Sequence, residues 1–154
     1  MRSIADEYLE NRVLTASREQ LHLMVVDAAI LFARRAIQGL ENRDFETSFN
    51  NFTSCRACVS ELLSALNPEP NPELIDRLKA LFLFVHERLV NADLYHDSQL
   101  ARDALKILEM HRETWIEVMG RVQQERQPVQ SAATNVTPAR AIAVGEMPER
   151  SWVT

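Results

Sequence analysis

Residues 17–41 read SREQLHLMVVDAAILFARRAIQGLE, and this stretch decides the fold because its apolar side chains recur at helical spacing. Ser17 followed three residues later by Gln20 is the pattern of a capping box, in which each side chain hydrogen-bonds the backbone N–H of the other residue. We therefore predict a helix that begins after Ser17 and runs to about Glu41. Its predicted core stripe is Leu21, Met24, Val25, Ala28, Leu31, Phe32 and Ala36.

Three further segments repeat this helical pattern, and the expected helices cover residues 45–67, 72–95 and 98–120. Asp44, Asn71 and either Asp97 or Ser98 are the predicted N-caps. Short connections make neighbouring helices antiparallel. The sequence therefore predicts an all-α protein, an antiparallel up-and-down four-helix bundle with a short extra N-terminal helix.

The chain divides into three predicted parts. Residues 1–15 form an N-terminal amphipathic segment, and residues 16–124 form the bundle. From residue 125 onwards the sequence loses helical periodicity and gains proline, serine and threonine, so we expect residues 125–154 to be a flexible C-terminal tail.

Composition excludes several classes of function. A hydrophobic fraction of 46% suits one globular domain of 154 residues, and a net charge of −5 argues against nucleic-acid binding, which needs a concentrated basic face. No apolar run approaches the roughly 20 residues of a membrane-spanning helix. The start, MRSIADEYLENR, has acidic residues where a signal peptide is basic and then apolar. We therefore expect a cytoplasmic protein that does not insert into membranes.

The residues that could support catalysis or bind a metal do not form a convincing site. Cys55 and Cys58 form a CxxC pattern, but it lies inside a helical pattern and not at a helix start after a strand, so we interpret them as ordinary thiols. Glu19 and His22 have the Glu-x-x-His spacing of a di-iron bundle, but no second such pair follows. His111 is interpreted as a hydrogen-bonded residue at the edge of the core. We expect no enzymatic activity, no cofactor and no metal.

The first and third long helices carry more apolar residues than one core stripe needs. The additional ones are Leu23, Val26, Ile30 and Ile37 on the first helix, and Leu83, Phe84 and Leu94 on the third. Two interpretations stay open: the N-terminal segment or a second copy of the chain covers them, or they line a groove for a partner peptide.

Residues spread from Tyr8 to Met119 match one known family in order and spacing. The matching residues are Tyr8, Val13, Thr15, Ala16, Ser17, Leu21, Met24, Asp27, Ala36, Glu61, Leu62, Arg88, Leu89, Ala92 and Trp115. In this pattern the chain resembles the FliS family of flagellin chaperones. The departures are Arg18 for a proline, Val25, Val26 and Ala28 for leucine, tyrosine and glycine, Phe82 for a tyrosine, and Asp93 for an asparagine. None of these departures breaks a helix.

The resemblance implies a cytoplasmic flagellar export chaperone. Such a protein binds the disordered C-terminal segment of flagellin, prevents its premature polymerisation, and assists its delivery to the type III export apparatus, where an export gate component would be a second partner. The resemblance also implies that the N-terminal segment shields apolar surface until the client binds. The expected partner-binding residues are Tyr8, Leu9, Leu23, Val26, Ile30, Ile37, Leu83 and Phe84.

Two other functions remain as alternatives. The first is a non-catalytic dimerisation or regulatory protein, which would form a homodimer through the same apolar faces. The second is a metalloenzyme of the ferritin-like type, which metal analysis of the purified protein would identify. We rank both alternatives below the export chaperone.

Overall fold

The structure is a computed structural model that describes the backbone of residues 2–69 and 71–153 and the side chains of residues 2–69 and 71–125. Five helices follow one another, and the described residues contain no strand: α1 (Ile4–Thr15), α2 (Arg18–Glu41), α3 (Phe45–Ser64), α4 (Pro72–Tyr95) and α5 (Ser98–Val153). The predicted all-α class is therefore confirmed. Within the described residues, no helix combines the length and the apolar character needed to cross a membrane.

The helices begin where local capping chemistry starts them. At the start of α2 the Gln20 backbone N–H donates to Ser17 Oγ over 3.1 Å, and the Ser17 N–H donates to Gln20 Oε1 over 3.0 Å. Asp44 accepts from the backbone N–H of Thr47 in the same way at the start of α3. These bonds satisfy N–H groups that the first turn of a helix leaves without a partner. The predicted starts of α2, α3 and α4 are confirmed.

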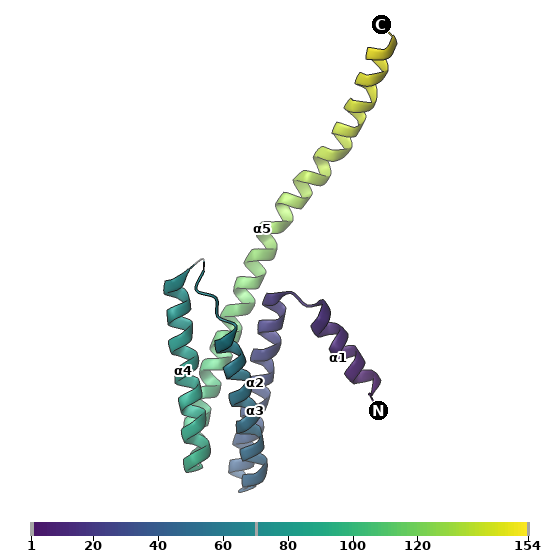
Figure 1. The fold of residues 1–154 in the computed structure, drawn as a ribbon. Coiled ribbons are helices and arrows are strands. Elements are labelled where there is room, and N and C mark those ends of the chain that lie inside the picture. Colours follow the sequence, from purple (N-terminus) through teal and green to yellow (C-terminus); the bar gives the residue numbers. More distant parts are fainter. Residues whose placement is uncertain (1, 70, 154) are drawn as a thin grey trace. The chain divides into compact units, whose positions relative to one another are not determined.

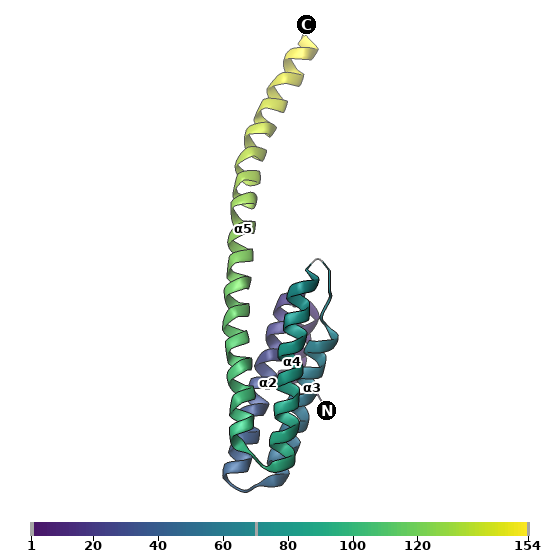
Figure 2. The ribbon, with the colours of Figure 1, turned by 90° about the vertical axis from the view of Figure 1, so that its left-hand side faces the viewer.

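The chain separates into two compact units, residues 1–115 and residues 116–154. In the first unit, α2, α3, α4 and the beginning of α5 lie side by side, as Figures 1 and 2 show from two directions. The turns after α2 and α4 are short, since only residues 42–44 and 96–97 separate the helices. The described core is a single apolar cluster between these helices.

The core stripe of α2 differs from the prediction. Its buried residues are Val26, Ala29, Ile30, Ala33, Ala36, Ile37, Gly39 and Leu40. Of the predicted stripe only Ala36 is fully buried, and Leu31 is 45% exposed. The predicted and observed stripes lie next to each other on the helix and both are apolar. The observed one contains Ala29, Ala33 and Gly39, whose small size lets a neighbouring helix approach closely.

A close approach of backbone to backbone occurs at Gly39. A Cβ atom added there would lie 2.8 Å from the backbone nitrogen of Ser48 and 3.1 Å from the carbonyl oxygen of Asp44. Both contacts are with backbone, which cannot rotate away as a side chain would. The α2–α3 turn is therefore built around the absence of a side chain at residue 39.

We expect the substitution Gly39→Ala to destabilise the protein by about 1 to 2 kcal/mol, because overpacking outweighs the better helix propensity of alanine. Gly120→Ala is the matched control, since a Cβ there meets nothing within 4 Å. It should be neutral or stabilising by up to about 1 kcal/mol. Urea unfolding of both variants measures the difference, and equal stabilities would contradict the close approach at Gly39.

The last helix extends beyond the prediction. The sequence predicted that the fourth long helix fades after Gly120, but α5 runs to Val153. The residues that follow Gly120, RVQQER, are good helix formers and include no proline, which explains why the helix does not end at the glycine. The side chains of residues 126–154 lie outside the described part, so the flexible tail stays a prediction.

Candidate partner-binding surface

Three of the residues predicted to bind a partner lie in the core. Val26 is completely buried, and Ile30 and Ile37 are buried as well. Leu23, from the same predicted groove, is half-buried. The groove predicted along α2 was therefore wrong for Val26, Ile30 and Ile37, because this side of the helix carries the core stripe.

The predicted residues on α4 and α1 lie at the surface. Leu83 and Phe84 are exposed on α4, and the guanidinium of Arg88 lies over the Phe84 ring at 4.7 Å from its centroid. Tyr8 and Leu9 are exposed on α1, where no residue is buried. The shielding role predicted for the N-terminal segment therefore stays a prediction.

Four more exposed apolar residues extend the surface around Leu83, and of these the sequence analysis named only Leu94, among the additional apolar residues of the third long helix. Phe45 and Phe49 are one turn apart on α3, and Val90 and Leu94 are one turn apart on α4. Leu83 and Val90 are two turns apart and so lie on the same side of α4. We call these five residues, Phe45, Phe49, Leu83, Val90 and Leu94, the α3–α4 face.

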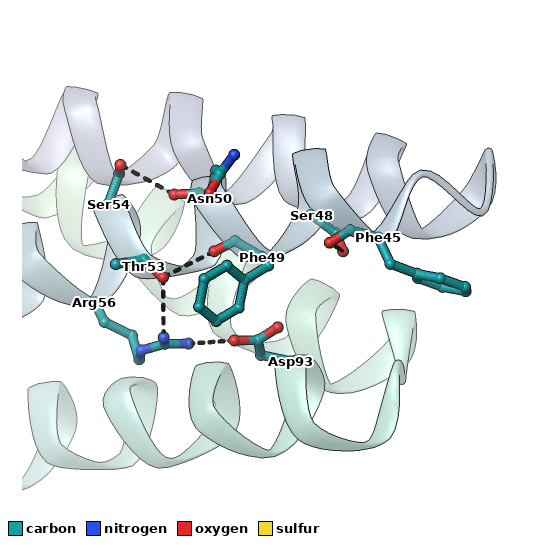
Figure 3. A network of polar contacts seen from close by, with 8 residues as sticks. All are labelled: Phe45, Ser48, Phe49, Asn50, Thr53, Ser54, Arg56 and Asp93. Atoms are coloured by element: carbon teal, nitrogen blue, oxygen red, sulfur yellow. Dashed lines mark hydrogen bonds and ion pairs between the residues drawn. The ribbon is translucent and has the colours of Figure 1, made fainter.

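Polar contacts join the two helices along this face. Arg56 Nη1 of α3 donates to Asp93 Oδ2 of α4 over 2.9 Å, and Arg56 Nη2 donates to Thr53 Oγ1 over 3.3 Å. Thr53 Oγ1 in turn donates to the carbonyl oxygen of Phe49 over 2.9 Å, so the network runs from Asp93 to Phe49 (Figure 3). At the end of the face, the Phe45 ring stacks on His96 with a centroid distance of 4.1 Å. The face is therefore an apolar surface with a fixed ion pair in it.

A separate apolar pocket of about 670 Å³ lies at the start of α2. Its walls come from α2, α3 and α5, and they consist of Arg18, Glu19, Leu21, His22, Val25, Glu61, Leu62, Ala65 and Trp115. The indole Nε1 of Trp115 donates to the carbonyl oxygen of Glu19 over 3.0 Å, which holds the first turn of α2 against α5. Only Ala16 and Ser17 connect α1 to this region.

Two histidines meet beside the pocket. The Nε2 atoms of His22 and His111 are 2.8 Å apart, so one imidazole donates its Nε2 proton and the other accepts. The predicted role of His111 as a hydrogen-bonded residue at the core edge is confirmed. Burial, followed by the charge of His111, lowers the pKa of His22 from 6.5 to about 4, and burial also lowers the pKa of His111. Both rings are therefore neutral at pH 7, which leaves one Nε2 free to accept in the hydrogen bond between them.

This pair should make the protein sensitive to acid. The unfolded chain takes up a proton on His22 near pH 6.5 and the folded chain only near pH 4, so stability is complete above pH 6.5 and falls as the pH drops towards 4. Because His22 is partly exposed, we expect a loss on the order of 1 kcal/mol from this residue. Urea unfolding at both ends of that window measures it. His22→Gln should reduce the pH dependence, and a pH dependence unaffected by this substitution would contradict the assignment.

Comparison with known proteins agrees with the sequence resemblance. Residues 1–122 match the family model described as "Flagellar protein FliS". A curated relative, the "Flagellar secretion chaperone FliS" of Bacillus subtilis (strain 168), is 29% identical over 119 residues, which cover 77% of this chain and 86% of the relative. The match spans α1 to α4 and the first part of α5, including the whole α3–α4 face. The chain belongs to the FliS family of flagellar secretion chaperones.

Proposed function

We propose that this chain is a cytoplasmic flagellar export chaperone that binds the disordered C-terminal segment of flagellin. By binding that segment it prevents premature polymerisation and assists delivery to the type III export apparatus. The observation that carries the proposal is the α3–α4 face, whose apolar side chains are exposed at helical spacing in a chain of a chaperone family. An amphipathic helix lying along α3 and α4 would cover these side chains.

The proposed activity is binding without catalysis. A disordered segment that folds on a chaperone loses conformational entropy, and burying apolar surface compensates for this loss. If the surface of the chaperone is already rigid, the chaperone itself loses little conformational entropy when it binds the segment. We propose that the four long helices form an antiparallel up-and-down bundle in solution, with α1 as an extra helix, and so provide such a surface.

Co-purification with full-length flagellin from the same organism tests this function. We expect a one-to-one complex by size-exclusion chromatography with light scattering, and a free chain that is monomeric or forms a homodimer which the client dissociates. A stable homodimer with no affinity for flagellin would instead support the dimerisation protein. An export gate component is the second partner we propose, and it should bind the complex in the same assay.

We further propose that residues 16–124 are the chaperone domain, that residues 1–15 shield apolar surface in the free protein, and that residues 125–154 are a flexible tail. The exposed apolar side chains of α1 and the pocket at the start of α2 support the shield, since a two-residue connection brings them into reach. An isolated helix of 12 residues is marginal in water and would be displaced easily.

Hydrogen exchange tests this division of the chain. We expect α2, α3 and α4 to be well protected, residues 4–15 to be weakly protected and to lose protection when flagellin binds, and residues 125–154 to exchange fastest. Protection of residues 4–15 that equals the core and does not change with client would contradict the shield. Strong protection of residues 125–154 would contradict the flexible tail.

A further inference from the structure

The ion pair between Arg56 and Asp93 is the most sheltered one in the described part of the chain. Their side chains are 21% and 14% exposed, whereas every other ion pair there leaves at least 41% of each side chain exposed. The neighbours of the pair along the helices are residues of the α3–α4 face, since Phe49 precedes Arg56 by two turns and Val90 precedes Asp93 by one. A helix that lies over Phe49 and Val90 would therefore also lie over this pair.

Covering the pair has a free-energy cost that depends on what covers it. Removing the remaining water from two charges is unfavourable unless additional hydrogen bonds replace it. A guanidinium has five N–H donors and a carboxylate about four acceptor sites, and the bonds to Asp93 and Thr53 occupy only some of them. An apolar side chain placed on the pair would desolvate it without compensation. A polar side chain at that position would supply the missing hydrogen bond.

We propose that the Arg56–Asp93 pair determines client specificity: it selects a segment that is apolar along the α3–α4 face but places a hydrogen-bonding polar side chain opposite the pair. This proposal rests on the proposed function, because it assumes that the client helix lies on this face. The pair discriminates mainly by rejection, since a wholly apolar helix would remove the remaining water from both charges without supplying a hydrogen bond in its place. It explains how an apolar surface avoids binding any exposed apolar helix.

Calorimetry with the C-terminal segment of the organism's own flagellin tests the proposal. The double variant Arg56→Met/Asp93→Leu replaces the pair by apolar side chains of similar size, and we expect it to bind the segment at least about tenfold more weakly, the loss of a charged hydrogen bond. The matched control Arg34→Met/Glu109→Leu removes a more exposed pair between α2 and α5 and should bind as the unchanged protein does. Circular dichroism melting checks that both variants fold. Asp93→Asn keeps the shape of the side chain and should show an intermediate loss of affinity for the segment.

Alanine scanning of the segment supplies the decisive comparison. At one polar position, alanine should weaken binding to the unchanged protein and have no effect on binding to Arg56→Met/Asp93→Leu. If the double variant binds as tightly as the unchanged protein, or if no polar position shows this coupling, the proposal is overturned. If the unchanged protein does not bind the segment, the proposed function fails first, and this result is distinguishable from the other two.

Discussion

Replacing Ile30 by aspartate is expected to unfold the protein, whereas the same replacement at the next residue, Leu31, should leave it folded. Ile30 is buried in the core stripe of α2, and Leu31 is 45% exposed beside the ion pairs between α2 and α5. A buried unpaired charge costs several kcal/mol, on the order of 3 to 5, which approaches the whole stability of a small domain of about 5 to 15 kcal/mol. The free energies of unfolding of the two variants should therefore differ by most of the stability of the protein, although the substituted residues are adjacent in the chain.

Circular dichroism melting of the two variants measures this difference. Ile30→Asp should show no cooperative transition, or one at a much lower temperature, while Leu31→Asp should melt close to the unchanged protein. The core stripe assigned to α2 would be wrong if Leu31→Asp unfolded and Ile30→Asp did not. Equal, small losses in both would show that neither residue belongs to the core.

Loss of client binding without loss of fold is expected for Leu83→Asp/Leu94→Asp. Both side chains are half exposed or more, so the variant should fold, but in the complex two carboxylates would lie under apolar side chains of the client. Apolar anchors at the centre of an interface contribute about 2 kcal/mol or more each, so affinity should fall at least about a hundredfold. Leu31→Asp is the control, because it places one added carboxylate on the surface between α2 and α5, away from the α3–α4 face. Titration calorimetry measures all three proteins.

A result in which Leu83→Asp/Leu94→Asp retains full affinity would place the client elsewhere, with the pocket beside Trp115 as the next surface to examine. Equal losses in the Leu31→Asp control would show that added negative charge, and not the position of the charge, weakens binding.

The helix boundaries were predictable because capping is local. Ser17 and Gln20 bond to each other, and Asp44 bonds to Thr47, within four residues of chain, so their pattern is visible without knowing the fold. The end of α4 at Tyr95 followed from the Asp97-Ser98 cap signal of the next helix. For the same reason the number of long helices could be predicted without knowing how the helices pack.

The side that each helix buries was less predictable because it depends on distant contacts. Two apolar stripes of α2 compete, and the choice follows from the approach of α3 to Gly39, a contact between helices. Phe45 and Phe49 have the helical spacing that is also typical of a core stripe, yet they lie at the surface, where His96 from the turn after α4 stacks on Phe45. Apolar periodicity is the same for a stripe that faces the core and for one that faces a partner.

The pairing of Arg56 with Asp93 was likewise outside the reach of sequence reasoning, since 37 residues separate them. In the sequence, the pairing is indicated only by a charged residue next to the core stripe of each helix. Many surface residues occupy such positions, so the sequence does not single out these two. The exposed apolar surface of α4 could therefore be predicted, through Leu83 and Phe84, but its extension onto α3 needed the structure.

The proposed function requires that this chain binds the C-terminal segment of flagellin. Titration calorimetry of the full chain with two ligands tests it most directly: flagellin from the same organism, and the same flagellin without its C-terminal segment. We predict one-to-one binding of the first and no measurable binding of the second. Equal binding of both ligands, or binding of neither, would contradict the proposed function.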